Sequence, residues 1–420
     1  MIKVKRARLL TFSLSIVFIV MVLSLCKYLN INKNVYAPTF SKTQVKNPNS
    51  PVSSSSVSSS PVFYDNKMVG VWVPYMDLGV NSLINTEEKF KEKFQNIINE
   101  SKKHHINTLI VHVRSHGDAM YSSKIFPWSH LLTGIQGANP GFDPLSYMVK
   151  ASHENGLKFH AWINPLRIRL KTQPEKLSDN NPYFKLGSEK YFISHTDGIC
   201  YNPAYPEVKK LIVDGVKEIA QNYNVDGIHF DDYFYPEEKN MTSKDCAYEE
   251  YLKNSKEKLN LQNWRKQHIN ALIKEAHATV KSVNSKILFG VSPSGNIKEC
   301  YEAGADVKLW ASENGYIDYL CPQIYWSINF PEMPFEKTAN EWKNILKNSK
   351  IKLYSGLALY KVNSDLDAGT WKNCNNVLEK ELKIIKNLNY DGLILYSWNF
   401  LNASHTKEEI INFEEELAKN

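Results

Sequence analysis

The sequence lacks the glycine-rich loops with which nucleotide-binding proteins hold phosphate groups. Neither a G-x-G-x-x-G motif nor a G-x-x-x-x-G-K-S/T motif follows the first segment of β type, at residues 69–75. Because an open, doubly wound sheet commonly carries such a loop after its first strand, the absence weakens that alternative. We expect no cofactor.

Cysteine is also scarce, and none of the six residues forms a pair at the spacing of metal ligands. Five of them lie outside the N-terminal apolar run, and an odd number argues against an extracellular disulfide framework. We therefore expect the cysteines to be small buried hydrophobic residues, and we expect no metal.

An excess of basic charge is absent from the globular part of the chain. The formal net charge is +7, but residues 1–67 hold nine of the 51 Lys and Arg residues and only one of the 44 acidic residues. The rest of the chain has 42 basic and 43 acidic residues, a net charge of −1. A neutral globular part argues against a general phosphate-binding surface, and so against a nucleic-acid partner.

The N-terminal segment has the pattern of an export signal. Lys3, Lys5, Arg6 and Arg8 precede an uncharged apolar run at residues 9–25. This pattern predicts a signal peptide or membrane anchor over residues 1–30. The run is just long enough to span a membrane, so an uncleaved anchor with a cytoplasmic N-terminus and a cleaved signal both remain open. We expect the protein at the extracellular face of the cell membrane or secreted.

Residues 31–67 form a polar stretch that ends in runs of serine and proline. Such a composition cannot bury enough apolar surface to fold, so we expect a solvated linker before one globular unit at residues 68–418. A chain that starts near Asp65 should therefore be soluble, folded and monomeric, with nearly the melting temperature of the full chain. Circular dichroism melting of both chains tests this. Aggregation or a far lower melting temperature of the shorter chain would show that the N-terminal segment is part of the fold.

Short apolar segments rich in β-branched and aromatic residues alternate with longer amphipathic segments after residue 68. The first kind is typical of strands and the second of helices. Strands are predicted at residues 69–75, 108–114, 158–164, 227–233, 287–292, 319–326, 353–360 and 392–398, and helices at 90–104, 206–223, 264–283, 335–348 and 376–387. This alternation predicts an α/β fold, a (β/α)8 TIM barrel with enlarged βα loops.

Polar, charged and aromatic residues follow several predicted strands at the point where each strand ends. Functional residues of a TIM barrel lie at the C-terminal ends of its strands. The residues expected to contact a substrate are Arg114, His116, Asp118, Trp162, Asn164, Arg167, His229, Tyr233, Gln323, Tyr325, Trp326 and Trp398. Aromatic side chains suit the apolar faces of sugar rings, which favours a polysaccharide as the partner.

The densest chemical signal is the pair Asp231 and Asp232 at the end of the fourth predicted strand. Side chains alternate along a strand, so Asp231 shares one face, expected to point inward, with His229 and Tyr233. Adjacent carboxylates repel, which should raise one pKa and provide a proton donor beside an ionised partner. Glycosidic cleavage needs such a pair, so we predict that both are catalytic. The alternative is that one of them only caps the next turn.

Several candidates have structural alternatives. His229 is either a substrate contact or hydrogen-bonded scaffolding of its strand. Arg114 either holds a catalytic carboxylate in a bidentate pair or ties loops together. Trp162, Trp326 and Trp398 are either sugar platforms or core residues.

Sequence stretches spread in order over nearly the whole predicted barrel are similar to a known family. They are residues 69–73, 114–121, 127–129 with 132–134, 143–145, 160–165 with Arg167, 226–236 and 322–326. On these residues the chain resembles the glycosyl-hydrolase-like 10 family of exported bacterial proteins. One departure is visible: the family commonly has an Asp-Pro-Gly turn before the fourth barrel unit, and this chain has Asn202, Pro203 and Ala204 there.

The resemblance implies a TIM-barrel glycosidase fold and an exported hydrolase of a cell-wall or extracellular polysaccharide. Fold relatives that act on N-acetylglucosamine polymers carry an acidic pair on strand four, and chitinase-like barrels place a tyrosine where Tyr325 stands. Because no second carboxylate comes from another strand end, the substrate's own 2-acetamido group is the expected nucleophile. Asp232 would then be the acid and Asp231 would orient the acetamide, or the roles are reversed.

Two other functions remain open at this point. His112 and His116 have the His-x3-His spacing of zinc-dependent polysaccharide deacetylases, although that spacing places both rings on one face only in a helix. The missing partner carboxylate is also compatible with a glycan-binding barrel that has no turnover.

Overall fold

The computed structural model describes residues 67–78 and 86–419. The predicted anchor at residues 1–30 and nearly all of the predicted linker at 31–67 lie outside the described residues. Within the described ranges, none of the helices combines the length and the apolar character needed to cross a membrane.

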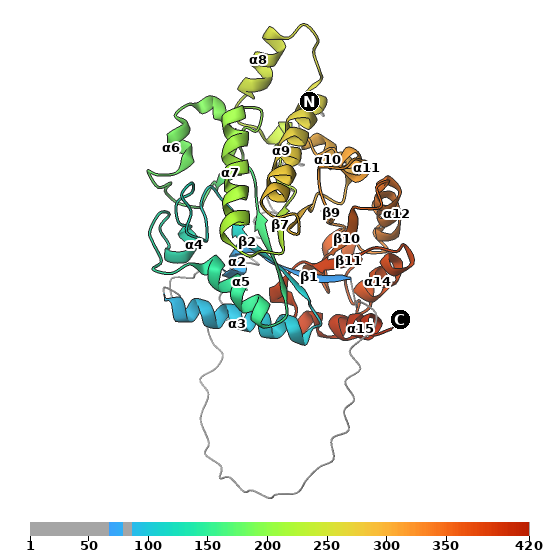
Figure 1. Cartoon of the computed structure of the whole chain (residues 1–420). Coiled ribbons are helices and arrows are strands. Elements are labelled where there is room, and N and C mark those ends of the chain that lie inside the picture. Colours follow the sequence, from blue (N-terminus) through green and yellow to red (C-terminus); the bar gives the residue numbers. More distant parts are fainter. Residues whose placement is uncertain (1–66, 79–85, 420) are drawn as a thin grey trace, which may run out of the picture. The chain divides into compact units, whose positions relative to one another are not determined.

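Eight parallel strands close into a barrel, and helices lie outside it (Figure 1). The strands are β1 (Met68–Val73), β2 (Thr108–Arg114), β3 (Lys158–Ile163), β7 (Gly227–Phe230), β8 (Leu288–Val291), β9 (Tyr319–Leu320), β10 (Lys352–Leu357) and β11 (Gly392–Leu395). They follow one another around the barrel in this order, and β11 pairs with β1. The predicted (β/α)8 barrel is confirmed.

The five helices predicted from periodicity are confirmed as α3 (Glu87–Lys103), α7 (Pro206–Asn222), α9 (Leu261–Val283), α12 (Phe335–Ile345) and α14 (Val377–Asn387). The others are α2 (Tyr75–Leu78), α4 (His130–Thr133), α5 (Pro144–Glu154), α6 (Pro182–Leu186), α8 (Cys246–Asn254), α10 (Ile297–Glu302), α11 (Val307–Ser312), α13 (Leu366–Gly369) and α15 (Lys407–Leu417). In α7, Val208, Ile212, Val216 and Ile219 recur at helical spacing and are buried. This face packs the helix onto the outside of the barrel.

Several strands end earlier than predicted. β7 stops at Phe230 and β9 at Leu320, so Tyr233 and Tyr325 lie in the loops that follow. After β9, Gln323 keeps only isolated bridges to Ser294 and Gly356. The hydrogen bonds between strands end where the sequence changes from apolar to polar side chains. The polar side chains therefore lie at the rim of the barrel.

The interior of the barrel forms a separate aromatic core. Its buried members are Met68, Trp72, Ile110, Trp162, Tyr319, Cys321, Tyr354 and Ile394. Glycine makes room for these large rings, since a Cβ on Gly290 would lie 2.1 Å from the ring of Tyr319. A second, larger core lies between the strands and the helices.

A chain of hydrogen bonds crosses this interior. Trp72 Nε1 donates to His229 Nε2 over 3.2 Å, so the proton of the neutral His229 ring is on Nδ1. That nitrogen donates to the Tyr319 hydroxyl over 2.9 Å, and the hydroxyl donates to His160 Nδ1 over 3.0 Å. Burial lowers the pKa of His229 far below its usual range and that of His160 to about 4. Both rings are therefore neutral parts of the scaffold at physiological pH.

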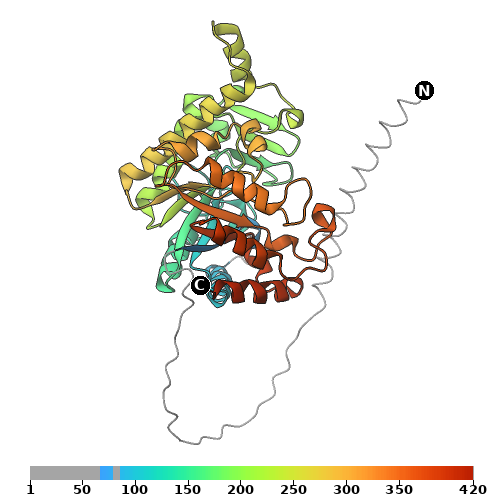
Figure 2. The same ribbon diagram turned by 90° about the vertical axis from the view of Figure 1, so that its right-hand side faces the viewer.

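The loop after β3 contains a small antiparallel sheet that was not predicted. It consists of β4 (Arg167–Leu170), β6 (Gly198–Tyr201) and β5 (Phe192–His195), with β6 in the centre. The turn that follows β6 contains Asn202, whose Nδ2 donates to Asp245 Oδ1 over 2.8 Å. An amide at this position thus satisfies a buried carboxylate where a second carboxylate would repel it. Farther along, α8 stands away from the barrel in both views (Figures 1 and 2).

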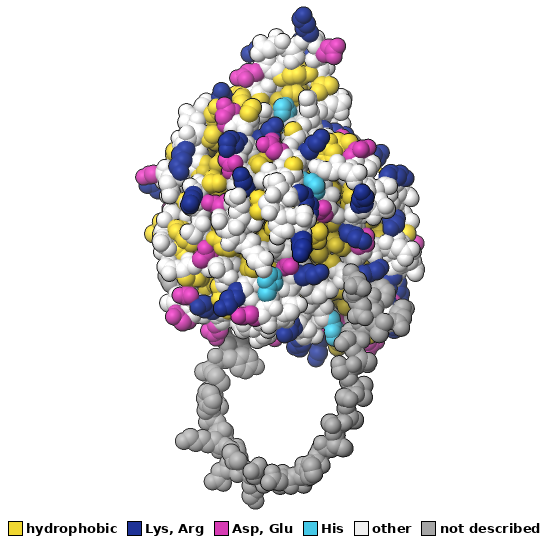
Figure 3. Space-filling view, in the orientation of Figure 1, with side chains coloured by type: hydrophobic (Ala, Val, Ile, Leu, Met, Phe, Trp, Pro, Cys, Tyr) yellow, Lys and Arg dark blue, Asp and Glu magenta, His cyan; other side chains and the backbone are white. Residues whose placement is uncertain are grey.

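The surface carries both signs of charge. Lys and Arg side chains and Asp and Glu side chains are both spread over the face in view (Figure 3), as the neutral composition of this part predicts. All five described cysteines are free thiols. Cys200, Cys300 and Cys321 are buried as expected, whereas Cys374 is half-buried and Cys246 is exposed.

Candidate active site

The C-terminal ends of the parallel strands meet at one rim of the barrel, and Asp231 and Asp232 follow β7 there. Asp231 is only 2% exposed. Its Oδ2 accepts a hydrogen bond from Trp162 Nε1 over 3.0 Å, and its Oδ1 accepts one from the backbone of Tyr233 over 3.3 Å. Asp232 is half-buried and is hydrogen-bonded by the side chain of Gln323. The two adjacent carboxyl groups therefore have different surroundings.

Burial raises the pKa of Asp231 to about 7, and the charge of Asp232 adds to this shift. The charge of Arg167 and the hydrogen bond from Trp162 act in the opposite direction. Burial also raises the pKa of Asp232, against the hydrogen bond from Gln323. The pair can thus hold a proton near neutral pH, mainly because of burial, and the repulsion on which the sequence prediction rested is the smaller contribution, at Asp231.

Arg167 supplies positive charge to this pair from the start of β4. Its guanidinium group lies over the ring of Tyr233, 4.2 Å from the ring centre, and donates to the backbone oxygen of Ser115 over 3.3 Å. The buried Asn164 accepts a hydrogen bond from the backbone nitrogen of Arg167 over 3.1 Å. Asn164 therefore shapes the turn that brings Arg167 to the rim, and Tyr233, 57% exposed, covers it.

A cavity of about 290 Å³ opens beside Asp232. Arg167, Tyr233 and Glu299 are among its lining residues. Polar groups that converge on a cavity at the C-terminal rim of a barrel are the usual setting of a TIM-barrel active site.

Glu299 is a carboxylate that the search of strand ends missed. It lies in the first turn of α10, and its carboxylate oxygens accept hydrogen bonds from Ser294 Oγ and Asn296 Nδ2 over 2.8 and 3.0 Å. Its charge contributes to the raised pKa of Asp232. An Asn followed three residues later by a Glu is a helix-start pattern, which was the only signal in the sequence. Glu299 comes from a helix and not from a strand end, so it lies outside the strand-end statement of the sequence analysis, and it adds a carboxylate to the cavity.

Trp162 and Tyr325 occupy the mouth of the barrel. Trp162 is buried, stacks on His112 with 3.7 Å between ring centres, and uses its indole nitrogen to hold Asp231. It is a core residue that supports the acid. Tyr325 is half-buried beside Trp72, and its hydroxyl makes no hydrogen bond to the described part of the chain. This hydroxyl is available to a ligand.

Trp326 and Trp398 lie farther out on the rim. Both are half-buried and pack against the outer core. Trp326 covers Gly295, where a Cβ would lie 2.4 Å from the indole ring. Because both are only partly buried, both remain candidate sugar contacts.

The structure places His229 and Arg114 below the accessible part of the site. His229 is fully buried, and both ring nitrogens already have protein partners, so it belongs to the scaffold. Arg114 is fully buried over the ring of Phe126 and donates to the backbone oxygen of Pro165 over 3.4 Å. It ties the loops after β2 and β3 together and makes no bidentate pair with any carboxylate in the described part of the chain.

His116 and Asp118 are also buried and do not line the cavity. They lie instead beside His130, a residue that the sequence had not indicated. His112 is directed away from them into its stack with Trp162. The His112 and His116 pair considered for a zinc-dependent deacetylase is therefore not assembled.

The geometry suits proton transfer to an acetal oxygen. Asp232 faces the cavity, and the charge of each carboxyl group affects the protonation of the pair. The positive charge of Arg167 partly offsets the negative charge of the pair. Carboxyl groups of raised pKa serve as general acids at neutral pH. Fold and site together define the class of protein, which is a TIM-barrel protein of the glycoside hydrolase type.

The chain belongs to the Glycosyl hydrolase-like 10 family, whose sequence model matches residues 67–372. It is 32% identical over 349 residues to the glycosyl hydrolase YngK of Bacillus subtilis, covering 77% of this chain and 67% of that protein. It is 31% identical over 368 residues to the glycosyl hydrolase DigH of Escherichia coli K12, covering 81% of this chain and 82% of that protein.

Solved structures share the fold at low identity. The glycoside hydrolase domain of PgaB (BpsB) from Bordetella bronchiseptica superposes with a TM-score of 0.56 and 11% identity, over 82% of this chain and 98% of that domain. The catalytic domain of β-amylase from Paenibacillus polymyxa gives 0.58 and 11%, over 84% and 99%. These likenesses confirm the TIM-barrel architecture.

Proposed function

We propose that the protein is an exported glycoside hydrolase that cleaves a cell-wall or extracellular polysaccharide containing N-acetylated amino sugars. The observation that carries this proposal is the acid pair at the barrel rim, with Asp232 facing a cavity and a pKa of about 7 for Asp231. Membership in a glycosyl hydrolase-like family and the fold of its structural neighbours support the same chemistry.

In the proposed reaction, Asp232 donates a proton to the leaving-group oxygen, because it is the member of the pair that lines the cavity. Asp231 remains beside it and orients the 2-acetamido group, which attacks the anomeric carbon in place of a protein nucleophile as the bond to the leaving-group oxygen breaks. Water then opens the cyclic intermediate, and its proton returns to Asp232. Tyr325 presents its hydroxyl to the acetamide oxygen. Arg167 and Gln323 keep the carboxyl groups in position.

The purified full chain should release reducing ends from an acetylated amino-sugar polymer in a panel of peptidoglycan, chitin-type and de-N-acetylated glucosamine polymers. Binding of a glycan in this panel without release of reducing ends would instead support a glycan-binding barrel that has lost turnover. Failure to bind or cleave any of them would contradict the proposed substrate class.

Tyr325→Phe tests the role of the acetamide. Loss of a hydrogen bond to a group that becomes charged should slow cleavage of acetylated substrates by about 10- to 100-fold. A de-N-acetylated polymer lacks the nucleophile, so this variant and the wild type should both cleave it only at the same low background rate. The neighbouring Tyr360, whose ring centre lies 5.8 Å from that of Tyr325, provides the control Tyr360→Phe, which should leave both rates unchanged. An equal loss on both substrates would remove the case for substrate assistance.

A further inference from the structure

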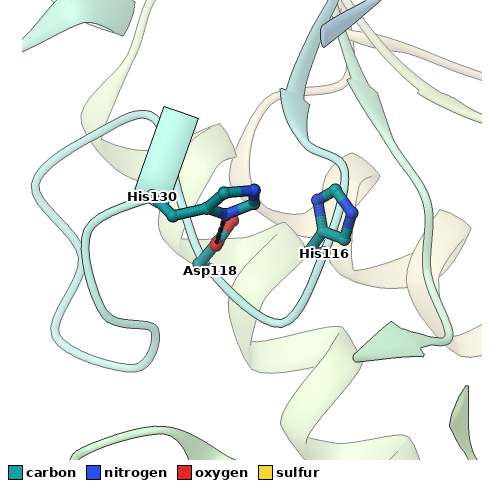
Figure 4. A group of neighbouring side chains, drawn as sticks. All are labelled: His116, Asp118 and His130. Carbon is teal, nitrogen blue, oxygen red and sulfur yellow. Dashed lines mark hydrogen bonds and ion pairs between the residues drawn. The ribbon is translucent and has the colours of Figure 1, made fainter. Parts of the chain in front are cut away.

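Three buried residues outside the acid pair form a cluster at the end of β2. His116 and Asp118 lie in the loop that follows this strand, and His130 is the first residue of α4. One nitrogen or oxygen atom from each lies within 4.8 Å of those of the other two. Figure 4 shows the His130 ring directed toward the His116 ring, with Asp118 against His130. No other group of this kind occurs in the described ranges.

Each of the three side chains keeps one buried atom without a hydrogen-bond partner. His130 Nδ1 is hydrogen-bonded to Asp118 Oδ2 over 2.9 Å, which leaves His130 Nε2 and Asp118 Oδ1 without partners. His116 Nδ1 is hydrogen-bonded to Ser115 Oγ over 2.9 Å, which leaves its Nε2 alone. Buried polar atoms are costly unless a partner satisfies them, and three in one cluster indicate a missing ligand.

The protonation states also suit a metal ligand set. Burial is the largest cause that lowers the pKa of His116 to about 3, so the ring is neutral. Burial alone would raise the pKa of Asp118, but the hydrogen bond from His130 holds it below its usual value. Metal binding requires a neutral imidazole and an ionised carboxylate.

We propose that His116, Asp118 and His130 bind one divalent transition-metal ion of the zinc type. Two imidazole nitrogens and one carboxylate oxygen are ligands that Zn²⁺ accepts, at distances of about 2.0–2.2 Å. The ligand atoms of the three side chains now lie within 4.8 Å of one another, and binding would draw them in around a common centre. Gln136, which donates to Asp118 Oδ2 over 2.9 Å, would orient the carboxylate from outside the ligand set.

Such an ion would be structural. The ligands are buried and do not line the cavity that contains Asp232. They join the loop after β2 to α4, and the His116 ring packs against Tyr75 with 5.2 Å between ring centres. The ion would fix this side of the rim without taking part in bond cleavage, so the site is independent of the proposed hydrolase activity.

The full chain, treated with a chelator and then dialysed against Zn²⁺, should retain about one zinc per chain by elemental analysis, with a higher melting temperature than the metal-free form. In His130→Gln, the Gln amide can still donate a hydrogen bond to Asp118, but the imidazole ligand is lost. Loss of an outer-shell partner weakens metal binding by roughly 10- to 100-fold, and His130→Gln should weaken zinc binding by more than that. The wild-type chain loaded with Co²⁺ should show the visible absorption bands of a low-coordinate nitrogen and oxygen site, which tests the geometry without any substitution.

His153→Gln is the matched control, because His153 forms a comparable pair with Asp226, 2.8 Å apart, outside the cluster. It should bind zinc as the wild type does. A wild-type chain that retains no zinc and shows no thermal shift with Zn²⁺ or Co²⁺ would overturn the proposal, and so would equal zinc affinities of wild type and His130→Gln.

Discussion

Replacing Asp231 or Asp232 by Asn should lower turnover by about 100- to 10,000-fold, the usual effect of losing a positioned general acid. The folded barrel should survive, because each substitution removes one of two adjacent buried charges. Initial rates of reducing-end release by the two variants and the wild type, with thermal melts of the same samples, test both halves of this prediction. Full activity in both variants would remove the case for this site.

Asp245→Ala is the structural comparison for these variants. Asp245 is also buried, but it caps α8 by accepting hydrogen bonds from the backbone nitrogens of Ala247 and Tyr248. Its loss should cost about 1 kcal/mol for the cap and about 1–3 kcal/mol more because Asn202 Nδ2 loses its acceptor, and it should leave turnover nearly unchanged. If Asp231→Asn behaved like this variant, Asp231 would be a cap.

The pH dependence of stability separates the two roles further. The folded-state pKa of Asp231, about 7, lies above the usual value for Asp, so the folded state binds the proton more tightly than the unfolded state does. The resulting stability is present below about pH 4 and is lost as the pH rises through 7. Asp231→Asn should therefore have the same free energy of unfolding as the wild type at pH 4. At pH 8 its free energy of unfolding should be higher than that of the wild type, by on the order of 1–4 kcal/mol. Wild-type turnover should fall above pH 7 as the pair loses its proton.

Tyr319→Phe should be the most damaging conservative change inside the barrel. The hydroxyl links His229 and His160, and its removal leaves two buried ring nitrogens without partners. At about 1–3 kcal/mol for each, the expected loss is roughly 2–6 kcal/mol. With about 2.1 cal/mol/K of unfolding entropy per residue, a barrel of roughly 350 residues should melt about 3–8 °C lower. Calorimetry of the two proteins measures both quantities.

Tyr390→Phe provides the control for this change. Tyr390 is equally buried, but its hydroxyl makes a single hydrogen bond, to the backbone oxygen of Ala339 over 2.8 Å. It should cost about half as much as Tyr319→Phe. Equal losses in the two variants would show that the chain of hydrogen bonds through His229 adds no stability beyond one ordinary bond.

The barrel could be predicted from the sequence because its signals are local. The alternation of β-type and amphipathic segments is visible within windows of a few turns, and each predicted strand and helix is present in the structure. The acid pair was equally visible, since two carboxylates that adjoin in the sequence must repel each other in any fold. The small sheet of β4, β5 and β6 was missed because its strands are only four residues long and carry no strong alternation.

The sequence could not predict how far below the barrel rim each candidate site residue is buried. Alternation along β7 places His229 and Asp231 on one face, but it does not say that His229 lies in the aromatic interior while Asp231 lies just under the rim. The same limit applies to Arg114, which the strand-end argument treats like Arg167. Closure of the barrel puts Arg114 under Phe126 and leaves Arg167 beside the acid pair.

The sequence by itself determined the barrel, the acid pair and the family, because these depend on periodicity, adjacency and motifs within short stretches. The tertiary structure decided which groups meet. Glu299 reaches the cavity beside Asp232, and His130 reaches His116 and Asp118, through loops whose paths depend on packing against distant helices. The chemistry of a barrel rim arises from side chains on several different loops, and closure of the eight strands brings these loops to one rim.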